Sequence, residues 1–480
     1  MKTRLQVLSD EERFQVHDRT LGILAKAGVR VDTATGRRFL GEAGAQVNEE
    51  SHVVRFPREL VEQCLATAPK KFVLGARRPG WDLEMNGGEC TMLIDGEAMF
   101  VLDRKTGERR LATHIDWLET TRMIDFLDEV GLYWSMVELP DEGEGNSTAR
   151  QINYWRRLFR NFSKHVQDGI STPKQAPWLL EVLQVIFGDR ETIRNQHPIS
   201  FLLCPLSPLI IDGPYTDAYL ALAGWDIPVG IMPMPLMGAT APASLISTTI
   251  LGNCEVLAMI CLLQAAAPGT PIIYAPALAI INPRTGNYSA GAIESALTGA
   301  ASTEMARYYG LPMEASGMGT DHHVPSIQAG YERAMGGMLP ALSWPDILVG
   351  PGLLGGSMIL SQEQLMIDVE MFKMYKHARR GIVTGEDMWL DDLIEQVGQG
   401  GNFLGERSTR SAIRSGEWHI GSLGVHEPYE TWQASGKPNL KEEINERIDE
   451  ILAAHQPLPL AEGVEQEMAR IYRKALELGG

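Results

Sequence analysis

The feature that most constrains this chain is an alternation, from about residue 111 onward, of long helical stretches with short apolar runs that end in Gly, Pro or Ser. Such alternation is typical of parallel β/α architecture. The runs are apolar throughout, as expected of strands that are buried on both faces. Their spacing of roughly 30 to 45 residues fits successive β/α units, so we predict a (β/α)8 TIM barrel of the α/β class.

Seven runs are predicted to be barrel strands, and an eighth is not evident. The predicted strands cover residues 132–137, 165–167, 200–204, 229–232, 271–275, 313–317 and 347–350. The predicted helices between them cover residues 115–129, 178–187, 243–266, 293–309 and 362–377.

The chain divides by pattern into three regions. Residues 1–110 are rich in charge and turns and are predicted to form an N-terminal α+β accessory region, with small strands or hairpins at runs such as 92–94. Ser9 and Glu12 have the spacing of a capping box, which predicts an N-terminal helix. Residues 111–380 are predicted to form the barrel, and residues 381–480 a helical C-terminal region that packs on it.

Composition excludes several classes of function. The net charge of -18 repels nucleic-acid backbones, and it gives a weak preference for a cationic ligand. The five cysteines lack zinc-finger spacing, which favours a reducing compartment. The N-terminal residues lack the apolar stretch of a signal peptide, and the most apolar segment, 227–281, is interrupted by prolines and glycines. We therefore expect a cytoplasmic protein without a membrane segment.

The densest polar cluster follows the sixth predicted strand. It contains Asp321, His322, His323, Gln328 and Glu332 behind a pair of glycines. These residues would serve in substrate binding or acid/base chemistry, or they belong to a solvated loop. A metal site is disfavoured, because adjacent side chains point apart in an extended chain and no third ligand is placed by spacing.

Other candidates lie at strand ends, where a barrel carries its functional groups. His165 falls on the second predicted strand, although a lone histidine is more often a packed, hydrogen-bonded residue. Trp134 and Tyr274 could present an aromatic face to a cation, although packing is the more common role. The loop 232–244 forms either the floor of a pocket or a rigid loop against the core.

A glycine-rich segment follows the seventh predicted strand. Gly350, Gly352, Gly355 and Gly356 would allow close approach by a ligand or by a cofactor carried on a second protein, and a plain turn explains them equally well.

Several segments in the same order resemble the trimethylamine methyltransferase superfamily, and the resemblance covers nearly the whole chain. The most specific are CPLSPL (204–209), PMPLMGATAP (233–242), NCEVLAM (253–259), ARYYGLP (306–312) and QAGYE (328–332). The resemblance implies a TIM barrel that holds a methylated amine at its mouth and docks a separate corrinoid protein, whose Co(I) attacks the methyl carbon. It also implies that the chain itself binds no cofactor tightly, since the partner supplies the corrinoid.

The resemblance is to the branch without pyrrolysine, which includes glycine betaine methyltransferases, because this sequence contains only the twenty ordinary residues. It therefore implies a quaternary amine as substrate. Trp134, Tyr274, Glu332 and Trp344 are then candidates to bind the cation, and His322 or His323 to bind a carboxylate. A homo-oligomer is expected on general grounds.

Two other functions stay open at this point. One is a non-catalytic protein that binds quaternary amines on the same fold. The other is a different barrel enzyme, such as a lyase that uses Asp321 and His322 as acid and base.

Overall fold

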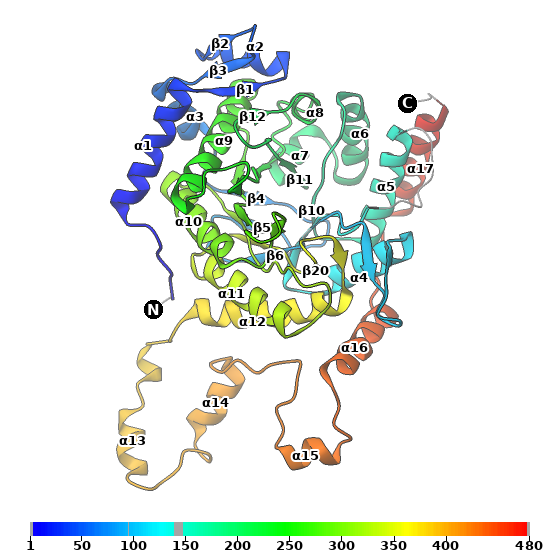
Figure 1. Ribbon diagram of the computed structural model, residues 1–480. Coiled ribbons are helices and arrows are strands. Elements are labelled where there is room, and N and C mark those ends of the chain that lie inside the picture. The colour runs from blue at the N-terminus through cyan, green and yellow to red at the C-terminus, as the bar shows by residue number, and fades with distance from the viewer. Residues whose placement is uncertain (1–2, 95, 139–146, 478–480) are drawn as a thin grey trace.

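Eight parallel strands form the centre of the computed structural model, which describes residues 3–94, 96–138 and 147–477 (Figure 1). The strands are β6 (Thr91–Leu93), β9 (Val130–Tyr133), β10 (His165–Gln167), β11 (Ile199–Leu203), β13 (Val229–Ile231), β15 (Ile272–Tyr274), β18 (Glu314–Ser316) and β19 (Ile347–Val349). Neighbouring strands follow chain order, and a parallel bridge between Tyr274 and Met313 joins β15 to the β18 edge. The predicted barrel and its seven strands are confirmed.

The eighth strand is β6, which precedes the boundary predicted at residue 110. Met92 pairs with Val130 of β9 on one side and with Leu348 of β19 on the other. Residues 92–94 were expected to form a small strand of the accessory region. That prediction is wrong, because this segment belongs to the eight-stranded sheet. Three residues are too few to distinguish a barrel strand from a hairpin by pattern, so the barrel begins about twenty residues earlier than expected.

Helices surround the barrel and carry the chain between strands. They are α4 (His114–Phe126), α5 (Ser147–Asn161), α6 (Ala176–Phe187), α7 (Arg190–Gln196), α8 (Pro214–Leu220), α9 (Leu245–Ala266), α10 (Ile293–Tyr309), α11 (Ile327–Leu342) and α12 (Gln362–Arg380). Helix α9 begins at its N-cap Ser244, whose side chain accepts from the Ser247 N–H. This helix is long and apolar enough to cross a membrane, but it is largely buried between the barrel and the N-terminal helices.

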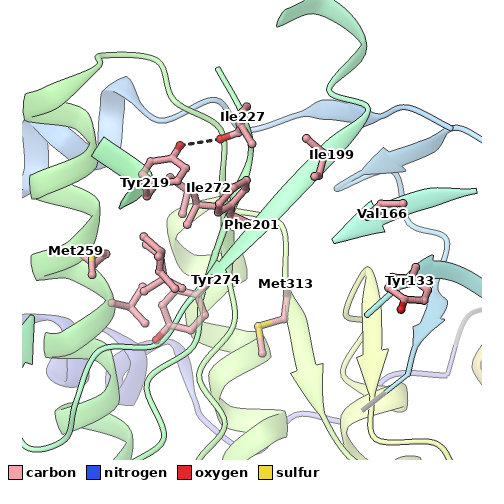
Figure 2. Close-up of a cluster of buried hydrophobic side chains, with 14 of the residues drawn as sticks. Tyr133, Val166, Ile199, Phe201, Tyr219, Ile227, Met259, Ile272, Tyr274 and Met313 are labelled. Carbon is pink, nitrogen blue, oxygen red and sulfur yellow. Dashed lines mark hydrogen bonds between the residues drawn. The ribbon is translucent and has the colours of Figure 1, made fainter. Parts of the chain in front are cut away.

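The main core lies between the strands and these helices (Figure 2). Phe201 of β11 meets the ring of Tyr219 of α8 edge-on, with ring centroids 5.6 Å apart. The Tyr219 hydroxyl donates to the carbonyl of Ile227 at 2.8 Å, so its polar atom is satisfied inside the core.

The N-terminal region packs on the outside of the barrel and on the end formed by the amino ends of its strands. Its helices are α1 (Asp10–Lys26), α2 (Ala34–Glu42) and α3 (Arg58–Thr67), and its strands are β1 (Val29–Val31), β2 (Gln46–Asn48), β3 (Val53–Arg55), β4 (Phe72–Leu74) and β5 (Leu83–Met85). The capping box of Ser9 and Glu12 is confirmed. Strand β1 pairs with β12 (Ile210–Ile211) of the barrel region, and hairpin β4–β5 covers the amino ends of the barrel strands.

The C-terminal region divides into two parts. Helix α16 (Leu440–Ala454) packs on α4 and α12, and α17 (Glu462–Glu477) packs on α5 and α6. Helices α13 (Asp391–Val397), α14 (Arg407–Ser415) and α15 (Tyr429–Ala434) instead extend away from the barrel beyond α12 (Figure 1) and bury none of their residues. Among the described helices of this region, α16 and α17 pack on the barrel, while the segment before α15 contacts α12 through the bonds of Ser422 to Glu370.

Two small sheets follow the carboxyl ends of the barrel strands. One contains β14 (Leu236–Met237), β16 (Ala279–Ile281) and β17 (Tyr288–Ser289), and the other contains β7 (Phe100–Leu102), β8 (Arg109–Leu111), β20 (Leu353–Leu354) and β21 (Ile359–Leu360). They form part of the barrel mouth.

Candidate functional site at the barrel mouth

A cavity of about 830 Å³ opens at the carboxyl ends of β6, β9, β10 and β11. This is the end at which TIM barrels carry their active sites. The polar, charged and aromatic residues that line it include Glu97, Trp134, Ser135, Glu138, Arg150, Gln151, Tyr154, Asp168, Cys204, Asp212 and Tyr215.

Trp134 is one of the aromatic residues of the cavity wall and follows β9 directly. Its indole ring lies against the backbone of Gly96, which follows β6. A Cβ added at Gly96 would lie 1.9 Å from Trp134 Cδ1 and 2.0 Å from Nε1. The absence of a side chain at position 96 therefore allows the ring to occupy this place.

Four carboxyl groups line the same cavity, and two of them have raised pKa values. Asp168 follows β10 and is half-buried in the cavity wall, where loss of hydration raises its pKa to about 7, although Trp155 Nε1 donates to its Oδ2 at 2.6 Å. Partial desolvation by the surrounding cavity wall and the nearby Glu138 charge also raise the pKa of Glu97, whose side chain is exposed. Near neutral pH the site can therefore change charge, as functional sites often do.

Below the cavity, Gln167 and Glu314 meet inside the barrel. They belong to β10 and β18, which are not neighbours in the sheet, so the 3.1 Å bond from Gln167 Nε2 to Glu314 Oε2 crosses the lumen. Burial raises the pKa of Glu314 to about 7. Among the described residues, Gln167 Oε1 and Glu314 Oε1 have no hydrogen-bond partner, so both can accept a donor from a ligand or water.

Gly230 of β13 packs closely against this pair. A Cβ at this position would lie 3.5 Å from both Gln167 Nε2 and Glu314 Oε2, and 2.8 Å from Leu202 on the cavity wall. The backbone of β13 therefore fills the space beside the two polar side chains, and a larger residue would not fit there without a shift.

Cys204 lies on the cavity wall but is not a nucleophile. Burial and the charges of Glu314, Glu97 and Asp212 raise the pKa of its thiol to about 12. The reactive form of cysteine is the thiolate, so this thiol stays protonated and unreactive at neutral pH.

The residues predicted from sequence are dispersed. Trp134 lines the cavity. His165 lies in the lower lumen, where Nδ1 contacts Gly75 O at 2.9 Å and Nε2 contacts Ser200 Oγ at 2.8 Å. Burial lowers its pKa to about 4, so the imidazole is neutral and structural.

Tyr274 and Trp344 also lie away from the cavity. The Tyr274 hydroxyl donates to Asn253 Oδ1 of α9 at 2.9 Å, which points this ring out of the lumen. Trp344 precedes β19 at the opposite end of the barrel, where its ring stacks 4.1 Å from the Arg379 guanidinium.

The polar cluster after β18 forms a network of its own on the rim. Asp321 accepts from Ser289 Oγ and the Ala290 N–H, both at 2.6 Å. Glu332 accepts from Gln328 Nε2 at 2.8 Å and from the Asp321 N–H at 3.0 Å. These bonds hold the loop in place, and none of these residues lines the mouth cavity.

The two histidines of this loop have local contacts. His322 Nδ1 lies 2.9 Å from Val324 O, two residues further on. His323 lies against Gly355, where a Cβ would approach its Nδ1 to 2.6 Å.

Intramolecular contacts also account for the other glycines of the loop after β19. A Cβ at Gly350 would lie 1.8 Å from Gly317 O, one at Gly352 would lie 2.5 Å from Met136 Cε, and one at Gly356 would contact Tyr288. A role in facing a corrinoid stays a prediction.

Sequence reasoning missed Glu97, Asp168, Gln167 and Glu314. The signal in the sequence that could have found them is a polar residue within, or directly after, an otherwise apolar predicted strand. Gln167 and Glu314 are polar residues within predicted barrel strands, and Asp168 is the first residue after one. A buried polar side chain on a barrel strand faces either a partner or the lumen.

Among the described residues, no group of three or more His, Cys, Asp and Glu side chains is arranged to hold a metal ion. The cavity instead suits a small organic cation, since it combines carboxyl groups with an aromatic face.

Comparison with known proteins agrees over the full length. The chain is 29% identical over 456 residues to trimethylamine methyltransferase MttB of Desulfitobacterium hafniense (strain DSM 10664 / DCB-2), covering 95% of this chain and 91% of the relative. It is 30% identical over 479 residues to a glycine betaine methyltransferase of D. hafniense (strain Y51), covering 99% and 98%.

A solved structure to which it is similar is the monomethylamine methyltransferase MtmB of Methanosarcina barkeri, at 12% identity, covering 98% and 92% of the two chains with a TM-score of 0.45. The family described as trimethylamine methyltransferase (MTTB) matches residues 1–479. The chain therefore belongs to the trimethylamine methyltransferase family.

Proposed function

We propose that this chain transfers a methyl group from a small quaternary amine, such as glycine betaine, to the Co(I) of a corrinoid protein. The observation that carries the proposal is the mouth cavity, which places Trp134 among Glu97, Glu138, Asp168 and Asp212. A quaternary ammonium group has no N–H to donate, so it is bound by aromatic faces and by nearby negative charge.

The cavity also offers a cationic side chain that could bind the carboxylate of a betaine. Arg150 is the one cationic side chain among the described residues that line it. A betaine has a carboxylate close to its ammonium group, and a guanidinium binds a carboxylate well. We propose that Arg150 faces the carboxylate while Trp134 and the acidic side chains face the trimethylammonium group.

The chemistry requires little from this chain beyond placement. A Co(I) corrinoid on the partner would supply the lone pair that bonds to the methyl carbon, and the electrons of the broken C–N bond would stay on nitrogen. A neutral tertiary amine leaves, so no protein acid is needed. The unreactive Cys204 thiol is consistent with a nucleophile that comes from the partner. The residues of the cavity bind, orient and exclude water, which can account for much of a methyl-transfer barrier.

The rim of the barrel fits a protein that brings the acceptor to the mouth. Large apolar side chains are exposed on the segments that follow the barrel strands, including Leu206, Tyr215, Met234, Tyr288 and Met358. Apolar surface of this kind, with polar residues around it, is typical of a protein interface. We propose that the corrinoid protein docks on this rim. An apolar rim would also suit the alternative function, a non-catalytic amine-binding protein that docks another partner. The test must therefore measure methyl transfer itself.

The test combines this chain with a corrinoid protein reduced to Co(I) and offers glycine betaine, carnitine, proline betaine and trimethylamine separately. Conversion of the visible spectrum to that of methyl-Co(III) with a quaternary amine is the expected result. If no amine gives conversion with a competent partner while calorimetry detects binding, the chain is a non-catalytic binding protein instead.

A variant pair tests the site itself. Trp134→Leu should weaken amine binding by about 2- to 30-fold, since a cation–π contact contributes roughly 0.5 to 2 kcal/mol. The matched control is Trp178→Leu on the outer helix α6, where the ring lies 5.1 Å from Lys474 Nζ and outside the cavity. Equal effects of the two changes would contradict the assignment.

A further inference from the structure

Glu255 places a carboxyl group in the middle of the buried helix α9, where an apolar side chain would be less costly. The residue is 1% exposed, and burial raises its pKa to about 7. A buried carboxyl group costs free energy unless hydrogen-bond donors meet it. The contacts of this side chain therefore indicate why a polar residue is present here.

Both oxygens of Glu255 accept from one turn, which follows β11. Ser207 Oγ donates to Oε2 and the Leu209 N–H donates to Oε1, each at 2.8 Å. The turn is closed by two backbone bonds between Leu206 and Ile210, at 2.8 and 2.9 Å. The carboxyl group of α9 therefore holds the tip of the 206–210 turn.

This turn belongs to the wall of the candidate site. Four of the residues that line the mouth cavity lie on the turn or close to it in sequence, namely Cys204, Leu206, Asp212 and Tyr215. Glu255 is not among the lining residues. Any effect of Glu255 on a bound amine must therefore pass through the turn.

The N-terminal region holds the same turn. The Arg30 N–H of β1 donates to Leu209 O at 3.0 Å, and the Asp32 N–H just after β1 donates to Ile211 O at 2.9 Å. Strand β1 lies beside β12 and close to α9 in Figure 1. The N–H of Leu209 thus bonds to α9 and its carbonyl to β1, so both elements fix the wall at this one residue.

We propose that Glu255 is a positioning residue of the methyl-transfer site, which fixes the 206–210 turn and through it the part of the cavity wall that carries Asp212 and Tyr215. The inference rests on the proposed function, because it assigns the cavity to the amine. Loss of the two hydrogen bonds should weaken amine binding, and a side chain that restores them should restore it. The methyl-transfer step should be unaffected, since Glu255 does not line the cavity.

The test uses the full chain and two substitutions at Glu255. Glu255→Met keeps the length of the side chain and removes both hydrogen bonds, with little change in volume. Glu255→Gln keeps both, because the amide can accept from the Leu209 N–H and donate to Ser207 Oγ.

The matched control is Gln264→Met on the same helix. Gln264 also makes two hydrogen bonds to a loop, accepting from the Gly269 N–H and donating to Thr270 O, both at 2.8 Å. That loop precedes β15, so it lies at the end of the barrel opposite the cavity. The control therefore loses equivalent bonds far from the candidate site.

Steady-state methyl transfer at a saturating concentration of Co(I) corrinoid protein is the first measurement. Glu255→Met should raise the KM for glycine betaine by about 5- to 30-fold, as expected for one or two lost hydrogen bonds, and leave kcat nearly unchanged. Glu255→Gln and Gln264→Met should keep the KM of the unchanged chain. An equal rise in KM in Gln264→Met, or no recovery in Glu255→Gln, would overturn the proposal.

Hydrogen exchange of the chain without amine is the second measurement, and it does not depend on the substrate. Exchange at residues 206–210 should become faster in Glu255→Met and stay slow in the other two variants. Unchanged exchange in Glu255→Met would overturn the proposal, as would faster exchange with an unchanged KM. If the unchanged chain transfers no methyl group from any amine, the proposed function fails, while exchange still decides whether Glu255 holds the turn.

Discussion

Gln167 and Glu314 form a hydrogen bond across the lumen of the barrel, from strands β10 and β18 that do not touch in the sheet. Each keeps one oxygen without a partner among the described residues. The pair lies below the mouth cavity, inside the barrel. Its low-dielectric surroundings favour the uncharged form of the Glu314 carboxyl group. It therefore links the stability of the fold to pH.

Glu314→Gln should become more stable relative to the unchanged chain as pH rises. The folded pKa of about 7 lies above the ordinary 4.5, so folding favours the protonated carboxyl group. That contribution is fully present below pH 4.5 and is lost as pH rises through 7. The difference in unfolding free energy should grow by up to about 3 kcal/mol between acid and mildly alkaline buffer. Urea unfolding across this range measures it, and a difference that is constant with pH would contradict the burial argument.

Binding of a quaternary amine should strengthen as pH rises from 6 to 8. The carboxyl groups of Asp168 and Glu314 both have a pKa of about 7, so each becomes negative in this range and attracts the cation. Asp168→Asn should flatten much of this dependence, because the amide still accepts from Trp155 but carries no charge. Calorimetric titration with glycine betaine at several pH values measures the effect. An unchanged pH profile in this variant would exclude Asp168 from the cation site.

Gly96→Ala should impair amine binding, while Gly169→Ala should not. A methyl group at position 96 would overlap the indole of Trp134, at 1.9 Å from Cδ1, and would force the ring out of place. At Gly169, also on the cavity wall, an added Cβ meets no described atom within 4 Å. The KM for the amine should rise by up to about 30-fold in the first variant, as expected for loss of an aromatic contact. Steady-state methyl transfer with both variants provides the comparison, and equal KM values would argue against the placement of Trp134.

The barrel could be predicted from sequence because its strands are buried on both faces and read as continuous apolar runs. Strand β6 was the exception, since its three residues carry no periodicity that separates them from a hairpin. The whole region 381–480 was expected to pack on the barrel, and α13, α14 and α15 bury none of their residues, because a helical pattern alone does not say what a helix contacts.

The candidate site could be predicted only in part. Trp134 was found because an aromatic residue at a strand end is visible in the sequence. Asp168 was missed because its importance comes from its place in the cavity wall and from its contact with Trp155 of α5. Glu314 was missed because its importance comes from burial and from its contact with Gln167 across the lumen, which sequence alone does not show. The dense cluster around Asp321 drew attention instead, although its polar groups are largely occupied by one another and by Ser289 and Ala290.

Asp368→Asn should destabilise the fold by about 3 to 5 kcal/mol, the range for breaking a buried ion pair. The side chains of Asp368 and Arg333 are both fully buried, and Arg333 Nη1 lies 2.6 Å from Asp368 Oδ2. Asp368 also accepts from the Gly352 N–H at 2.8 Å, so the pair holds the loop after β19. Thermal unfolding at pH 8 measures the loss. Glu42→Gln, which breaks the exposed pair with Arg38, is the control and should leave the melting temperature nearly unchanged.

Met234→Asp and Met358→Asp should weaken the docking of a corrinoid protein on the barrel rim without changing amine binding. Both side chains are about half exposed on the barrel rim, and neither lines the mouth cavity. A charge placed in an apolar contact should raise the KM for the corrinoid protein by about 5- to 30-fold, as is usual for an interface residue that matters. Phe14→Asp, on the outer surface of α1 and equally exposed, is the control and should leave this KM unchanged. Since the amine site is intact in all three variants, calorimetry with glycine betaine should give one affinity throughout. If the two rim variants transfer methyl groups as the unchanged chain does, the partner docks on a different surface.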